Sequence, residues 1–310
     1  MKNSPLEKYL INWLEDHKNF IEPNTHRDYS GLIKRYIIPY IGDKKMSSVK
    51  PYDIEQLYLS LQRQNIGIRT IHYTHAVLRS AFEHAVFHQF MPYNPCRGVR
   101  LPKYYKEEMK ILDSNEIKKF LGAAKSSRYS VLYHLALVTG MRQGELLGLS
   151  WNNVDLNSGI IGLRLQAKRI PGKGIHLVHL KTRTSQRSIR IGRGMINLLQ
   201  SYYTSSKEIN HINSVHDYDL VFSTMYGNPI GKSNLLKDYY RTLEMASVRK
   251  IRFHDLRHTA ASMMLNQGIP VIVVSKILGH SKPSTTLDYY GHVIGQMENK
   301  AASIMDRFIS

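Results

Sequence analysis

The chain has 310 residues, with 43 Lys and Arg against 24 Asp and Glu, which gives a formal net charge of +19. This length allows two ordinary domains, and an apolar content of 42% can give each a core, so intrinsic disorder is not expected. The charge indicates a polyanionic partner, either nucleic acid or an acidic membrane surface. The sequence lacks an apolar run of the roughly 18 residues that a transmembrane helix needs and a secretory hydrophobic region, which weakens the membrane alternative. A single cysteine, Cys96, suits a reducing cytosol.

The first hundred residues are predicted to form a bundle of about four amphipathic helices. Apolar residues recur at helical spacing in 6–14, 29–37 and 54–61, and in a longer segment from Thr70 to about Phe90. Proline and glycine separate these segments, among them the stretch 39–43. We interpret the apolar stripes as core.

Residues 94–110 contain two prolines, many charges and no sustained periodicity, which is typical of a linker. We therefore predict a helical domain at 1–100, a linker at 101–110 and a second domain at 111–310. Asp113 and Glu116 form a potential capping box for a helix that begins at Ser114. A buried helix is expected over 130–138, ended by Gly140.

The hydrophobic period changes in the middle of the second domain. Short strand-like runs at 160–165 and 175–180 lie around the sequence PGKG, and 188–191 could add a third. Beyond Met195 the helical pattern returns, at 235–246, 254–265, 271–278 and in the tail 293–308. The sequence therefore predicts a mainly α protein with a small β region, an α+β fold.

Both domains are basic, with a net charge of +6 for residues 1–105 and +13 for residues 106–310. No acidic residue lies between Asp155 and Glu208, although that interval holds Arg164, Lys168, Arg169, Lys173, Lys181, Arg183, Arg187, Arg190, Arg193 and Lys207. A basic stretch is often only a solvated face. The lack of compensating acids favours phosphate contact here.

Two segments place arginine where it could bind a phosphate. In TGMRQGELLGLSW, Arg142 follows Gly140 at a turn, and Glu145 could hold it in place or pair with it structurally. In RFHDLRHTAASMMLNQG, His254 and Arg257 lie three residues apart at a helix start, where backbone N–H groups favour an anion. The alternative for this pair is a packed histidine and a solvated arginine, and the neighbouring His258 is interpreted as packing.

Two further segments carry a possible nucleophile and a possible acid. His280 follows Gly279, with Tyr289 and Tyr290 downstream. A tyrosine hydroxyl, with an ordinary pKa of about 10, becomes a nucleophile when cations stabilise its charge and a base takes its proton. In HLKTRTSQRSIRI, Lys181 could protonate a leaving alkoxide. Chemistry alone does not rank Lys181 above Lys168 and Lys173.

The order of these residues resembles the tyrosine recombinases, the phage-integrase family. The resemblance rests on Arg142 in TGMRQGELLGL, Lys181 in LKTRTSQRSI, His254 and Arg257 in HDLRHT, His280 in LGHS and Tyr290 in TTLDYYGHV. The helical first domain, with WLEDHKNFIEPNTHRDYSGLIKRYIIPYIG, resembles the family's SAM-like core-binding domain, and the rest its catalytic domain. Many such integrases carry a separate arm-binding domain, and no segment that resembles it precedes residue 1. Either the protein lacks one or the given chain starts after it.

The resemblance implies a site-specific recombinase that integrates or excises a mobile element through a 3′-phosphotyrosyl intermediate. Tyr290 would be the nucleophile, preferred over Tyr289 because the family's tyrosine precedes an x-His-Val element. The remaining roles would be phosphate binding by Arg142 and Arg257, protonation of the departing 5′-oxygen by Lys181, and phosphate bonding or proton transfer by His254 and His280. No cofactor, metal or ATP is expected, since the phosphotyrosine keeps the bond energy and no GxxxxGK[ST] loop or acidic cluster is present.

The partners implied are double-stranded DNA attachment sites and a homo-tetramer on DNA, in which the tail 293–308 docks on a neighbouring protomer rather than on its own domain. Accessory DNA-bending or directionality proteins could take part, and no membrane is involved. A bacterial or phage-encoded protein of this kind would lie in the cytoplasm, on the nucleoid.

Two alternatives stay open at this point. One is a DNA-binding regulator without catalysis, in which residues 271–289 form a helix-turn-helix with Ser284, Thr285 and Thr286 facing the groove. It leaves the ordered Arg, Lys, His, Arg, His and Tyr set unexplained. The other is a topoisomerase-like enzyme that nicks and religates one strand through the same tyrosine.

Overall fold

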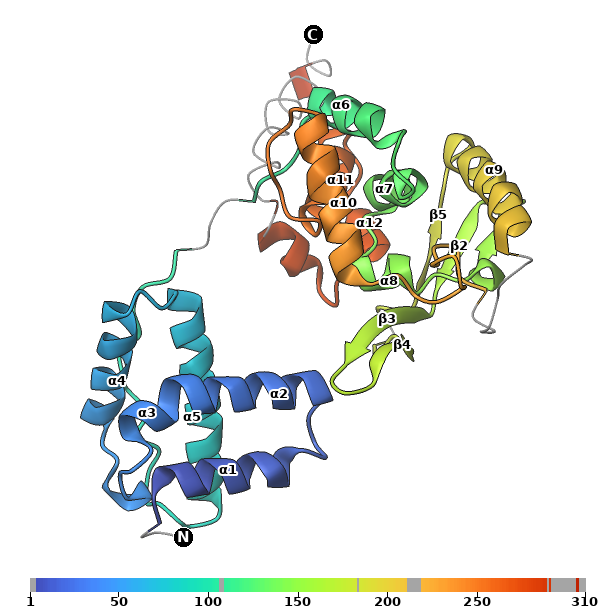
Figure 1. The fold of residues 1–310 in the computed structure, drawn as a ribbon. Helices are drawn as coiled ribbons and strands as arrows, with labels where there is room; N and C mark the ends of the chain where they lie inside the picture. Colours follow the sequence, from blue (N-terminus) through green and yellow to red (C-terminus); the bar gives the residue numbers. More distant parts are fainter. Residues whose placement is uncertain are drawn as a thin grey trace. The chain divides into compact units, whose positions relative to one another are not determined.

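A computed structural model describes residues 4–105, 109–182, 184–210, 219–288, 290 and 305–306. The described residues up to 105 form one compact unit, and nearly all described residues from 109 onward form a second (Figure 1). The predicted linker falls partly outside the described residues, as does nearly all of the predicted tail helix.

The first unit is a helical bundle, as the sequence predicts. Its elements are α1 (Leu6–His17), α2 (Pro23–Leu32), the π-helical turn η1 (Ile33–Ile37), α3 (Ile38–Ile41), the 3₁₀ turn η2 (Met46–Ser48), α4 (Pro51–Arg63) and α5 (Ile68–Phe87). The helix break expected at 39–43 lies later than predicted, after Ile41. Pro39 occupies the first turn of α3, where the N–H that proline lacks would have no partner within the helix. The apolar stripes form a single core around Trp13, Tyr9 and Phe82.

The second unit is mostly helical. Its helices are α6 (Ser114–Ala124), α7 (Ser130–Thr139), α8 (Gln143–Leu147), the 3₁₀ turn η3 (Trp151–Asn153), α9 (Arg193–Asn210), α10 (Lys232–Met245), α11 (Asp255–Asn266) and α12 (Val271–Leu278). The capping box of α6 is confirmed, because the Asp113 carboxylate accepts from the backbone N–H of Glu116, whose own carboxylate accepts from the N–H of Asp113. The helix α7 contacts α6, α9 and α11, which lie around it in Figure 1.

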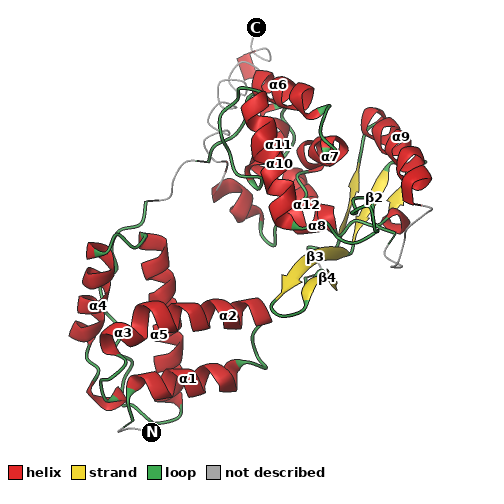
Figure 2. Ribbon diagram, in the orientation of Figure 1, coloured by secondary structure: helices red, strands yellow, loops and turns green. Residues whose placement is uncertain are grey.

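Short antiparallel strands form two small sheets, coloured yellow in Figure 2. The three-stranded sheet has the order β1 (Val154–Asp155), β2 (Ile160–Leu163) and β5 (Arg187–Arg190), and the two-stranded sheet pairs β3 (Leu165–Ile170) with β4 (Gly174–His179). The predicted run 160–165 is thus divided at Arg164 between two sheets. The register pairs Ile161 with Ile189, and both are buried.

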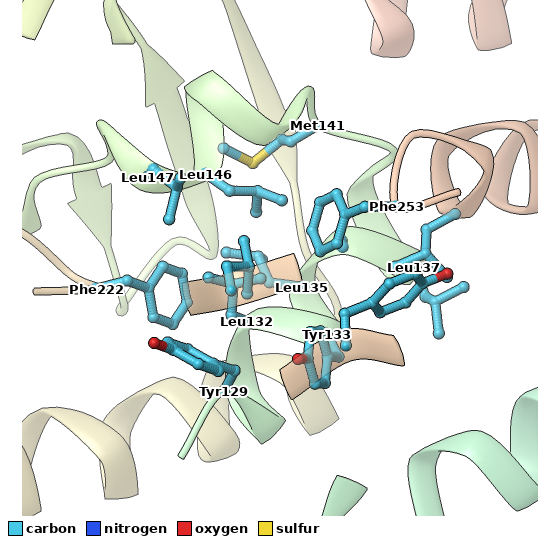
Figure 3. Close-up of a cluster of buried hydrophobic side chains, with 14 of the residues drawn as sticks. Tyr129, Leu132, Tyr133, Leu135, Leu137, Met141, Leu146, Leu147, Phe222 and Phe253 are labelled. Carbon is cyan, nitrogen blue, oxygen red and sulfur yellow. The ribbon is translucent and has the colours of Figure 1, made fainter. Parts of the chain in front are cut away.

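The core of the second unit is built on the apolar helix α7. Figure 3 shows Leu132, Tyr133 and Leu135 of this helix with Phe222 and Phe253. These side chains are nearly inaccessible to solvent, and burial of each contributes roughly 1.5–3 kcal/mol. The packing fixes the C-terminal end of α7, which leads directly into the segment that carries Arg142.

Candidate active site

The turn between α7 and α8 holds Arg142 in a defined position. Gly140 ends α7 in the left-handed conformation, with φ 63°, and a Cβ there would lie 2.6 Å from Leu278 Cδ2, so the site needs glycine. Arg142 then precedes α8. Its backbone N–H donates to Glu145 Oε2 at 2.8 Å, and its Nη1 donates to Oε1 at 2.9 Å. The predicted contact between Glu145 and Arg142 is therefore confirmed.

Arg187 is a second arginine on the same carboxylate, and no sequence motif singles it out. Its Nη1 and Nη2 each donate to Glu145 at 3.0 Å, and its Nε donates to the carbonyl of Ile277 at 2.6 Å. Burial alone would raise the pKa of Glu145, but the bonds and charges of Arg187 and Arg142 outweigh it and lower that pKa. The available signal was alternation along β5, because Arg187 shares a face with the buried Ile189.

The start of α11 supplies His254 and Arg257. Arg257 is 4% exposed, and its Nη1 and Nη2 donate to the carbonyls of Gly140 at 2.9 Å and Leu278 at 2.7 Å. Both acceptors lie at helix C-termini, where a positive charge is favourable. Burial, followed by the positive charge of Arg142, lowers the pKa of Arg257 to about 9, so the guanidinium stays charged at neutral pH. His254 directly precedes α11, and desolvation followed by the charge of Arg257 lowers its pKa.

His280 lies immediately after α12. Gly279 ends this helix in the left-handed conformation, and its carbonyl accepts from Nη2 of Arg142 at 3.3 Å. Nδ1 of His280 is hydrogen-bonded to the hydroxyl of Thr286 at 2.8 Å. Burial, then the charges of Arg257 and Arg142, lowers the pKa of His280 to about 4, so the ring is neutral at pH 7. Thr286 is fully buried, which contradicts the helix-turn-helix alternative in which it faces a DNA groove.

Tyr290 is buried beside α11. Its hydroxyl is hydrogen-bonded to Nδ1 of His258 at 2.6 Å, and the two ring centroids are 5.8 Å apart. The interpretation of His258 as packing alone was therefore wrong. Burial, followed by the nearby His254, lowers the pKa of His258 to about 4. Tyr289, the other candidate, lies outside the described residues.

Lys181 lies in the exposed segment that joins β4 to β5. The same segment contains Thr184, whose carbonyl oxygen would be 2.9 Å from a Cβ placed on Gly279. The segment that carries Lys181 thus passes beside the end of α12 at Thr184. Lys168 lies on β3 and Lys173 in the turn between β3 and β4.

Five of the six predicted residues thus come from the start of α8, the start of α11, the residue pair that follows α12, and residue 290. Arginines supply fixed positive charge, and a neutral histidine such as His280 can accept or return a proton. This combination suits phosphoryl transfer to a tyrosine. No set of three or more His, Cys, Asp or Glu in the described residues could hold a metal ion, and no described helix is long and apolar enough to cross a membrane.

Comparison with known proteins agrees with this chemistry. The phage integrase family matches residues 110–296, and the N-terminal SAM-like domain of phage integrases matches residues 6–62. The chain is 32% identical to a tyrosine recombinase XerC-like protein of Caldanaerobacter subterraneus subsp. tengcongensis, over 93% of this chain and 79% of that protein.

Solved structures share the fold. The integrase of transposon Tn1549 in complex with transposon right end DNA has a TM-score of 0.83 and 20% identity, covering 96% of this chain and 99% of that one. A lambda integrase tetramer bound to a Holliday junction has a TM-score of 0.70 and 18% identity, covering 93% and 77%. With both domains matched in chain order and the predicted residues gathered in the second, the chain belongs to the phage integrase family of tyrosine recombinases, enzymes that cleave and rejoin DNA through a tyrosine nucleophile.

Proposed function

We propose that this recombinase acts at specific DNA attachment sites to integrate or excise a mobile element, and that Tyr290 is its nucleophile. One observation carries the proposal. Arg142 and Arg257, from different helices, both donate to carbonyls of the turn Leu278–Gly279, which leads directly to His280. Two guanidinium groups and a neutral imidazole therefore converge on one small region, as the binding of a single phosphate requires.

The proposed reaction conserves the phosphodiester energy. The Tyr290 oxygen attacks the phosphorus, a bond to phosphorus forms, and the bond to the 5′-oxygen breaks. Lys181 gives its proton to that oxygen, while His254 or His280 accepts the tyrosine proton. The products are a 3′-phosphotyrosyl link and a free 5′-hydroxyl, which attacks the link on the partner strand.

Arg142 is better placed than Arg257 to contact the phosphate directly. The Arg142 side chain is 37% exposed and keeps N–H groups beyond those bonded to Glu145 and Gly279. Arg257 is nearly buried, so its main contribution in this arrangement is a fixed charge behind the site. Neither role requires a cofactor.

The assembly and surroundings are part of the same proposal. The structural relative bound to a Holliday junction is a tetramer, and we propose that this chain also acts as a homo-tetramer on DNA, with exchange of its C-terminal helix. Accessory bending or directionality proteins would select integration or excision. The protein would work in the cytoplasm on nucleoid DNA.

A nicked suicide duplex tests the chemistry. The duplex carries the attachment site, taken from the DNA that flanks the gene, and the products are separated on a denaturing gel. Wild type and Tyr289→Phe should form a covalent protein–DNA adduct, and Tyr290→Phe should form none. An adduct that survives in Tyr290→Phe but is lost in Tyr289→Phe would overturn the assignment.

The same assay separates the alternatives. A regulator without catalysis forms no adduct on any duplex. A topoisomerase-like enzyme forms the adduct and relaxes supercoiled DNA, but two attachment sites in one reaction give no recombinant product. Recombinant products that appear only when both sites are present support strand exchange.

A further inference from the structure

The side chain of Tyr290 lies in an apolar cluster of the second unit. It packs with Ala261 and Leu265 of α11 and with Val274 and Leu278 of α12, and it is 1% exposed. Its environment is therefore that of a core residue. A nucleophile has to bring its oxygen to within about 3–3.5 Å of the phosphorus, in line with the leaving oxygen. A covered hydroxyl cannot meet a phosphate on a DNA duplex in this way.

The hydroxyl of Tyr290 has a hydrogen-bond partner in this cluster. Nδ1 of His258 lies 2.6 Å from the Tyr290 oxygen, within the range of a strong hydrogen bond. The low pKa of His258 keeps its ring neutral at pH 7, so it can share a hydrogen bond with a neutral phenol. A buried hydroxyl without such a partner would be costly, so this bond contributes to keeping the tyrosine inside.

We infer that His258 is a positioning residue that holds Tyr290 in a buried place, which the tyrosine must leave before it attacks DNA. The inference rests on the proposed role of Tyr290 as nucleophile. It assigns His258 a function separate from those proposed for His254 and His280. Loss of the hydrogen bond should shift Tyr290 toward exposed positions by about ten-fold, the effect of one ordinary bond.

The chain contains a matched control in its first unit. The hydroxyl of Tyr58, which is 2% exposed, is hydrogen-bonded to Nδ1 of His75 at 2.9 Å. Removal of His75 breaks the same kind of bond far along the chain from Tyr290. A general effect of losing a buried histidine can therefore be told apart from a specific release of Tyr290.

Nitration by tetranitromethane of the protein alone, mapped by peptide mass spectrometry, measures the exposure of each tyrosine. In a Tyr289→Phe background, Tyr290 should react as slowly as Tyr58 and far more slowly than Tyr105, which is 78% exposed. His258→Leu should accelerate nitration of Tyr290 about ten-fold and leave Tyr58 unchanged, while His75→Leu should do the reverse. In His258→Gln, whose side chain can still form a hydrogen bond with the hydroxyl, the nitration rate of Tyr290 should stay close to that of the parent. Rapid nitration of Tyr290 in the parent, or no acceleration in His258→Leu, overturns the inference.

The suicide duplex then links the holding bond to the reaction. His258→Leu should form adduct at least as fast as wild type. Any gain should lie in the maximal rate of adduct formation and not in the DNA concentration that gives half of that rate. The urea midpoint should show that the variant is folded. A folded His258→Leu protein with a large loss of adduct would overturn the inference, since it would make His258 a participant in the chemistry. Survival of the adduct in Tyr290→Phe would instead overturn the proposed nucleophile, whatever the nitration result.

Discussion

Glu145 is fully buried and receives hydrogen bonds from two guanidinium groups, so its charge and those of Arg142 and Arg187 depend on one another. Removing one partner of such a set leaves an uncompensated charge in the interior. Glu145→Gln keeps the shape of the side chain but not its charge. We expect it to lower the free energy of unfolding by about 3–5 kcal/mol and to reduce adduct formation, because Arg142 loses its anchor.

Urea denaturation measures the free energy of unfolding, and the denaturing gel measures adduct formation. Glu83→Gln is a suitable control, because Glu83 pairs with Arg97 at the surface, where ion pairs contribute little. It should leave both measurements nearly unchanged. Equal unfolding midpoints for wild type and Glu145→Gln would show that Arg142 is held by other contacts.

The buried histidines make stability depend on pH. The pKa values of His258 and His280 are about 4 in the folded protein, against about 6.5 for an unperturbed histidine. Between these values the unfolded chain binds more protons than the folded one. The stabilisation is therefore complete above pH 6.5 and is lost as the pH falls toward 4.

His280→Gln should flatten this dependence. The free energy of unfolding is measured by urea denaturation at several values between pH 7 and pH 5, where carboxylates contribute little to the slope. Wild type should lose stability steadily over this range, and the variant should lose less. Parallel curves would mean that His280 titrates alike in the folded and unfolded states.

At the scale of elements, the end of α12 packs against the segment that joins β4 to β5. Gly279 has φ 70°, and a Cβ there would lie 2.8 Å from Nη1 of Arg187 and 2.9 Å from the carbonyl oxygen of Thr184. Gly172, in the turn between β3 and β4, has φ 73° but open space around it. The two glycines thus share a positive φ and differ in their contacts.

This pair separates backbone strain from close packing. Gly172→Ala should lower the free energy of unfolding by about 1–2 kcal/mol, the cost of a left-handed conformation for a residue with a Cβ. Gly279→Ala should cost more than Gly172→Ala and should also reduce adduct formation, because it displaces Arg187 and the approach of the Lys181 segment. Urea denaturation of both variants provides the comparison, and equal losses would argue against tight packing at Gly279.

Elements with local signals were predictable from the sequence. Gly140 ends α7, and Asp113 with Glu116 begins α6, because stop and capping signals lie within a few residues of the helix end. The division of residues 160–165 between two sheets was not predictable from the sequence. It depends on the pairing of β2 with β5 and of β3 with β4, which only the folded structure shows. The same holds for the site. Motifs named most of its residues, but the bonds from Arg187 to Glu145 and from His258 to Tyr290 join residues 42 and 32 positions apart.

For the whole molecule, the positive charge is shared between two units that each have a core of their own. Residues 1–105 and 106–310 carry net charges of +6 and +13. Because both units are positively charged, each unit is expected to contact DNA phosphates. Affinity for DNA should then be dominated by the release of counterions, with sequence read by fewer contacts.

This origin of affinity predicts a steep dependence on salt. If about 6–10 phosphates are contacted, affinity for a non-specific duplex should fall about 10³- to 10⁵-fold between 50 and 200 mM salt. Fluorescence anisotropy of a labelled duplex over this range gives the slope of log K against log salt. Lys173→Gln, at an exposed position of the basic region, should reduce the magnitude of the slope by about one if that lysine contacts a phosphate. A slope near zero would contradict the electrostatic origin of binding, whereas a steep slope unchanged in Lys173→Gln would place the contacts elsewhere on the two units.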